Sequence, residues 1–100
     1  MDLNYYFLYF DMSTIKCTTE DIDNTLRSFA KDYRRINNSS WIFTYPNEFD
    51  GHFTCKEDYL IDEHFDCYFN ENSIFFIVKL KEHYNYQLPD EVCDFIDPER

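Results

Sequence analysis

The stretch YYFLYFDM, residues 5–12, decides the fold class of this chain. It is an unbroken run of aromatic and aliphatic side chains that ends near an aspartate, a pattern typical of a central strand covered on both faces. A second strong strand is predicted over residues 73–80, where Ile74, Phe76 and Val78 alternate with their neighbours and share one face. Two such strands indicate a sheet with a substantial core.

The segments between these strands predict helices. Residues 18–36 carry apolar side chains at spacings of four and three, with Thr18 as N-cap and Asp21 at the N3 position of a capping box. The end of this helix has an alternative, because residues 33–36 also fit the start of a strand. A second helix is predicted over residues 54–69, again with a capping box at its start.

The remaining elements complete an α+β pattern. Residues 40–45 predict a middle strand after a turn, and residues 90–96 predict a short helix after a proline. We therefore expect a single ferredoxin-like (βαββαβ-type) domain over residues 1–100, with an antiparallel sheet, two helices on one face and a short C-terminal helix. Its remaining strand comes from residues 33–36 or from residues 48–53.

The charge is strongly negative. The chain has 9 Lys and Arg against 20 Asp and Glu, a formal net charge of −11. Phosphate contacts need cations, so this balance argues against direct nucleic-acid binding. It favours a basic protein partner, or serves solubility alone. The single glycine excludes a glycine-rich phosphate loop.

The N-terminal segment predicts a cytoplasmic protein. It has no basic n-region, and its apolar run is too short for a signal peptide or a membrane span. Cys17, Cys55, Cys67 and Cys93 are then free thiols, with a disulfide as the alternative if the protein is exported. Cys17 precedes a predicted helix N-terminus, a position that can lower a thiol pKa and so indicates redox reactivity; a structural thiol is the alternative.

Four stretches resemble the small CRISPR-adaptation family called Cas-two and its SinR-like relatives. They are residues 6–11, 39–44, 72–78 and 88–96, which match the family's strands and its C-terminal Leu-Pro helix. The resemblance implies a homodimeric ferredoxin-like domain. The sequence departs from the family pattern in two ways: it has few basic residues, and it has no glycines near the middle strands.

Asp11 is the candidate catalytic residue that this resemblance implies. In the family, the aspartate that ends the first strand is proposed to hold a divalent metal such as Mg²⁺ for nuclease activity. The alternative is an aspartate that caps the following turn. Without that activity, no cofactor is expected.

A zinc site is a weaker alternative. His52, Cys55, His64 and Cys67 supply the nitrogen and sulfur ligands that tetrahedral zinc prefers. His64 and Cys67 are three residues apart and share a face of the predicted helix. Half-buried core residues are the alternative reading of all four.

The acidic segment over residues 47–72 carries the leading functional hypothesis. It holds eight acidic side chains against Lys56 alone. Aspartates that recur every four residues would lie about 6 Å apart along one helix face, similar to the phosphate spacing of a nucleic-acid strand. The alternative is a solvated helix face with no partner. The predicted partner-binding residues are Glu57, Asp58, Asp62, Glu63 and Asp66.

These patterns together predict a small acidic homodimeric interaction protein. It would be a non-enzymatic inhibitor or decoy, anti-defence or antitoxin-like, that binds a basic, nucleic-acid-handling protein. The alternatives are a metal-dependent nuclease using Asp11 and a structural adaptor in a CRISPR-like complex. Because 21% of the residues are aromatic, some aromatic side chains should lie at a dimer interface. The predicted interface residues are Trp41, Tyr45, Tyr84 and Tyr86.

Overall fold

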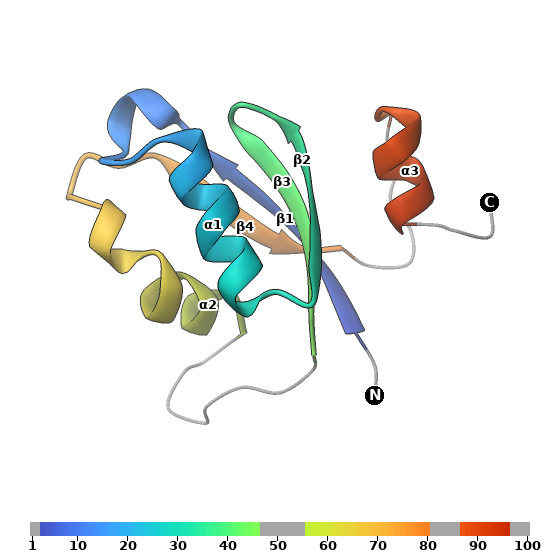
Figure 1. Ribbon diagram of the computed structural model, residues 1–100. Coiled ribbons are helices and arrows are strands. Elements are labelled where there is room, and N and C mark those ends of the chain that lie inside the picture. The colour runs from blue at the N-terminus through green and yellow to red at the C-terminus, as the bar shows by residue number, and fades with distance from the viewer. Residues whose placement is uncertain (1–2, 47–55, 81–86, 97–100) are drawn as a thin grey trace.

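Four antiparallel strands form a sheet that carries helices on both faces (Figure 1). The computed structural model describes residues 3–46, 56–80 and 87–96. The strands are β1 (Leu3–Phe10), β2 (Asp32–Asn37), β3 (Ser40–Pro46) and β4 (Phe75–Lys79). Their order is β2-β3-β1-β4, so β2 and β4 are the edges of the sheet in the described part of the chain. The predicted α+β class with an antiparallel sheet is confirmed.

β1 is the central strand that its sequence predicts. It pairs with β3 on one side and with β4 on the other. Tyr6, Leu8 and Phe10 are completely buried on the face that carries the larger core. Tyr5 and Phe7 are half-buried on the opposite face. Both faces of this strand therefore contribute to packing, which explains the unbroken apolar run.

Helix α1 (Thr19–Phe29) begins as predicted and ends earlier. Its capping box is present, because the Asp21 backbone N–H donates to Thr18 Oγ1 at 3.1 Å and the Thr18 N–H donates to the Asp21 carboxylate at 2.9 Å. The prediction of a helix through residue 36 was wrong. Ala30 is extended, and the next residues form β2, whose hydrogen bonds to β3 replace those of a longer helix. The alternative of a strand over residues 33–36 is confirmed.

Strands β2 and β3 form a hairpin around the predicted turn. The Ser39 backbone N–H donates to Asn37 Oδ1 at 2.8 Å within this turn. In β3, Trp41 and Phe43 face the larger core, whereas Ile42 faces the smaller core on the opposite side of the sheet. The predicted middle strand over residues 40–45 is confirmed.

Helix α2 (Lys56–His64) is shorter than predicted. It ends at His64, and a short 3-10 helix, η2 (Asp66–Tyr68), follows in place of a continuous helix to residue 69. Leu60 and Phe65 are completely buried against the sheet, as the predicted buried face requires. The capping box predicted at residues 54–57 lies partly outside the described residues.

The helices divide between two cores. Figure 1 shows α1 and α2 on one face of the sheet and α3 (Asp90–Ile96) on the other. The smaller core joins Ile42 of β3 to Val92 and Ile96 of α3. Two helices on one face and a short C-terminal helix are therefore confirmed. None of the helices in the described ranges has the length and apolar character that a bilayer crossing demands.

Candidate functional site

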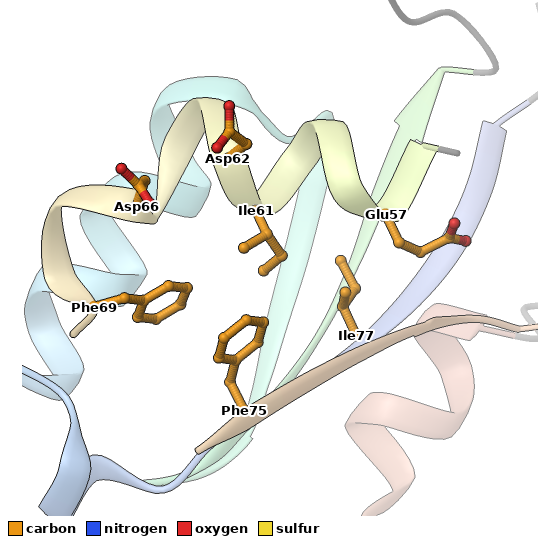
Figure 2. A pocket seen from close by; sticks show the side chains of 7 residues that line it. All are labelled: Glu57, Ile61, Asp62, Asp66, Phe69, Phe75 and Ile77. Carbon is orange, nitrogen blue, oxygen red and sulfur yellow. The ribbon is translucent and has the colours of Figure 1, made fainter. Parts of the chain in front are cut away.

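A groove of about 510 Å³ lies between β4 on one side and α2 with η2 on the other (Figure 2). Its lining combines apolar side chains with carboxylates from the predicted partner-binding segment. The lining residues are Glu57, Ile61, Asp62, Asp66, Phe69, Phe75 and Ile77. The groove therefore joins the acidic segment to β4, the edge strand that follows it in the chain.

The floor of the groove is aromatic and continuous with the core. The rings of Phe69 and Phe75 stack with their centroids 4.3 Å apart and their planes 11° from parallel. Phe75 also meets the buried ring of Phe10 edge-on, at 6.2 Å. Phe69 reaches this position because the chain becomes extended directly after η2. Packing against the core holds this floor in place, so its shape is formed before any ligand arrives.

The rim of the groove carries the carboxylates of Glu57, Asp62 and Asp66. Asp62 and Asp66 are exposed, and Figure 2 shows their carboxylates pointing away from the aromatic floor. Within the described part of the chain, none of the three forms an ion pair or a side-chain hydrogen bond. Their charge is therefore available to a cation from outside.

Three of the five predicted partner-binding residues thus line one groove. Glu63 is exposed and does not line it, and Asp58 lies within α2. The prediction that one helix face carries Asp62 and Asp66 was wrong, because α2 ends between them and Asp66 begins η2. The change of helix type still leaves both carboxylates at the same rim.

Sequence reasoning missed the apolar half of this groove. Phe75 and Ile77 were predicted to share a strand face, and Phe69 to end a helix. No local signal places that strand beside α2, because the two are brought together only by the sheet. The sequence signal that could have indicated the groove is the pair Phe69 and Phe75, which flank the turn over residues 70–74.

Asp11 caps the turn that follows β1, which is the structural alternative to a catalytic role. Its carboxylate accepts hydrogen bonds from Ser13, at 3.1 Å from the backbone N–H and 2.6 Å from Oγ. It thereby caps a short 3-10 helix, η1 (Met12–Thr14), which follows β1. Across residues 3–46, 56–80 and 87–96, no three His, Cys, Asp or Glu side chains are grouped to hold a metal ion.

The structure does not place His64 and Cys67 on one helix, as the zinc alternative predicts. His64 is the last residue of α2 and Cys67 lies in η2, so they do not share a helix face as predicted. The imidazole instead stacks on Phe29, with centroids 3.9 Å apart and planes 3° from parallel. Burial lowers the pKa of His64 below its usual range. His52 and Cys55 lie outside the described residues.

Cys17 does not have the lowered thiol pKa that a position before a helix N-terminus can produce. Burial raises the pKa of its thiol to about 11, and the nearby Asp21 and Cys67 add to the rise. Burial and neighbouring negative charge therefore outweigh the effect of the helix N-terminus on this thiol. A thiol of this acidity is a weak nucleophile at neutral pH.

The residues predicted for a dimer interface do not form one exposed surface in the described part of the chain. Trp41 is completely buried in the larger core, where its indole N–H donates to Asp23 Oδ1 at 2.8 Å. Tyr45 is half-buried and packs against Phe29, and Tyr84 and Tyr86 lie outside the described residues. Among the described residues, the large apolar side chains that are exposed belong to β4 and the residue before it. They are Ile74, Phe76 and Val78, with 54%, 48% and 44% of their surface exposed.

The site therefore consists of an acidic rim, an aromatic floor and an edge strand with apolar side chains on its far face. This arrangement suits the recognition of a cationic and partly apolar protein surface. Comparison of the chain with protein-family models, curated proteins and solved structures gives no match, and the resemblance to the Cas-two family stays a prediction.

Proposed function

We propose that this chain is a small, non-enzymatic interaction protein whose acidic groove binds a basic protein partner. The observation that carries the proposal is the groove between α2 and β4, where three unpaired carboxylates of the described chain surround an aromatic floor. The partner class is a protein that handles nucleic acid, and the activity is inhibition or decoy binding of the anti-defence or antitoxin kind.

The chemistry of the groove supports a Lys or Arg side chain as its ligand. The apolar stem of such a side chain packs on Phe69 and Phe75, while its charged end reaches a carboxylate at the rim. Exposed rim charges mainly accelerate association, and the apolar contacts below them slow dissociation. The two halves of the groove therefore contribute to different steps of binding.

The net charge supports the choice of partner. A formal charge of −11 repels phosphate backbones and attracts the basic surfaces that bind them. A carboxylate row on such a surface competes directly with nucleic acid. This competition is the physical basis of the proposed inhibition.

The proposal extends to fold type, assembly and location. The order β1-α1-β2-β3-α2-β4, with β1 and β2 both paired to β3, supports a ferredoxin-like domain. We also propose that the protein is a homodimer and lies in the cytoplasm. Neither is needed for the groove to bind its partner.

The test compares two triple variants that change the net charge equally. The groove variant is Glu57→Gln, Asp62→Asn and Asp66→Asn. The control replaces exposed glutamates on other segments, as Glu20→Gln, Glu71→Gln and Glu91→Gln. Each variant is used to capture proteins from a lysate of the host cell, and the captured proteins are then measured against purified chain.

We expect the wild type and the control variant to capture a basic, nucleic-acid-binding protein from the lysate, and the groove variant not to capture it. Its affinity should fall steeply as salt rises, because exposed charges are screened. Equal retention by both variants, or a flat salt series, would show that the groove does not bind the partner.

A further inference from the structure

The outer edge of β4 leaves its backbone polar groups unpaired within the described chain. β4 pairs with β1 alone there and forms one edge of the sheet. Exposed edges of this kind are templates for another strand. The described strands and loops provide no hydrogen-bond partner on this side of β4.

The register shows which groups face outward. The Leu80 N–H donates to the Tyr5 carbonyl and the Asp11 N–H donates to the Ile74 carbonyl, each at 2.8 Å. Hydrogen-bonded and non-hydrogen-bonded pairs alternate along an antiparallel ladder, so Phe76 and Val78 use their backbone groups toward β1. Three residues therefore direct their N–H and C=O groups outward. They are Phe75, Ile77 and Lys79.

These outward groups adjoin the acidic groove. The side chains of Phe75 and Ile77 line the groove, so a strand added along β4 would have one row of side chains on the groove side. Its alternate row would lie on the far face of the sheet. There it would meet the exposed side chains of Ile74, Phe76 and Val78.

Charge complementarity selects the occupant of this edge. The row on the groove side runs beside the rim that carries Glu57, Asp62 and Asp66, where the long side chain of Lys or Arg can reach a carboxylate. The other row faces apolar side chains, which favour Val, Ile or Leu. A second copy of this chain is less favourable, because antiparallel pairing of two β4 strands would bring two acidic rims together.

We propose that the partner binds by adding an extended segment of alternating basic and apolar residues to the outer edge of β4. This inference rests on the proposed function and names the mode of binding at the same groove. Main-chain hydrogen bonds to β4 supply affinity, and the two rows of side chains supply specificity. The chain thus recognises a pattern of alternation as well as a positive charge.

The test uses synthetic peptides of about eight residues, a typical upper length for a strand. One alternates Lys and Val, and a second has the same composition in two blocks. Two further peptides carry backbone N-methyl groups on the alternating sequence, either on Lys or on Val. In an antiparallel addition the Lys residues pair with the outward groups of β4, so only methylation of Lys should break the ladder.

The expected result is that the alternating peptide binds at least about tenfold more tightly than the block peptide, and that Lys methylation costs about tenfold or more. Methylation of Val should change little. On binding, amide exchange should slow at Phe75, Ile77 and Lys79, while the amides of Phe76 and Val78, already bonded to β1, change less.

Other outcomes overturn the inference and separate it from the proposed function. If the block and alternating peptides bind equally, and the groove variant weakens both, the acidic groove binds cations without strand addition. If no peptide binds while the lysate partner still depends on the groove, the strand mode is wrong and the partner site stands. If wild type forms a dimer whose contact protects the β4 amides without peptide, the occupant is a second copy.

Discussion

Replacement of Asp23 by alanine tests how α1 is fastened to the sheet. One carboxylate oxygen accepts the indole N–H of Trp41 at 2.8 Å, and the other accepts from Arg35 Nη1 at 3.1 Å. Asp23 thereby joins α1 to β3 and β2. Trp41 is completely buried, so Asp23→Ala leaves a buried donor without its acceptor.

The expected loss follows from these two contacts. An unsatisfied buried donor costs about 1–3 kcal/mol, and an ion pair whose arginine is 45% exposed contributes at most about 1 kcal/mol. We expect Asp23→Ala to lower the free energy of unfolding by about 2–3 kcal/mol. This corresponds to a fall in Tm of about 10–20 °C for a domain of this size. Asp23→Asn keeps an acceptor oxygen for the indole and should lose less than about 1 kcal/mol.

Urea unfolding followed by the fluorescence of Trp41, the single tryptophan, measures these changes. Asp32→Ala is the matched control, because Asp32 pairs with Arg34 at 2.9 Å on the surface without a buried indole. It should cost no more than Asp23→Asn. Equal losses for the alanine and asparagine variants of Asp23 would refute the assignment to the indole hydrogen bond.

Four other predictions concern titration, reactivity, assembly and catalysis. Burial lowers the pKa of His64, so the folded state binds a proton at this imidazole less readily than the unfolded state does. The free energy of unfolding should therefore fall as the pH drops below about 6.5. In urea titrations between pH 7 and 5, His64→Phe should flatten this dependence on pH. Because the pKa of Cys17 is raised from 9.0 to about 11, its thiolate fraction at pH 8 is about a hundredfold lower than that of an ordinary cysteine. Mass spectrometry should therefore find iodoacetamide on the exposed Cys67 before Cys17. Light scattering at micromolar concentration should give twice the 12.3 kDa mass of one chain, and a value of one mass would contradict the homodimer. Cleavage of RNA or DNA with Mg²⁺ or Mn²⁺ should be absent or very weak; strong cleavage that Asp11→Ala abolishes would support the nuclease instead.

The strands with unbroken or alternating apolar residues could be predicted from the sequence, whereas the end of α1 could not. Phe29, Tyr33 and Ile36 have helical spacing, yet the last two lie in β2. The deciding contact is distant in the chain, because Thr44 of β3 accepts from the Lys31 N–H at 2.9 Å. Local periodicity carries no information about such a partner.

The candidate site divides in the same way. The acidic residues of its rim are visible in the sequence, and three of the five predicted partner-binding residues line the groove. Two of these three, Asp62 and Asp66, belong to the run with a four-residue period. Its floor depends on the stacking of Phe69 on Phe75, two side chains separated by the turn after η2. Only the placement of β4 beside α2 turns an acidic helix into a groove, and that placement is a property of the whole sheet.

Helix α3 covers a second, smaller core, so we expect this part of the domain to be less stable than the larger core. The helix is held by Val92 and Ile96, by the Tyr5 hydroxyl at 3.2 Å from the Phe95 carbonyl, and by Arg34 over the Phe95 ring at 4.7 Å. Partial unfolding should release it while the larger core under α1 and α2 stays intact.

Release of α3 would uncover Ile42 and Phe7, which lie opposite each other on β3 and β1. Val78 of β4, opposite Phe7 and already exposed, would then continue an apolar row across the sheet. A partly open chain with such a row is prone to aggregate. A net charge of −11 on every copy makes these open chains repel one another, so the acidity that suits a basic partner also protects the protein while it is open.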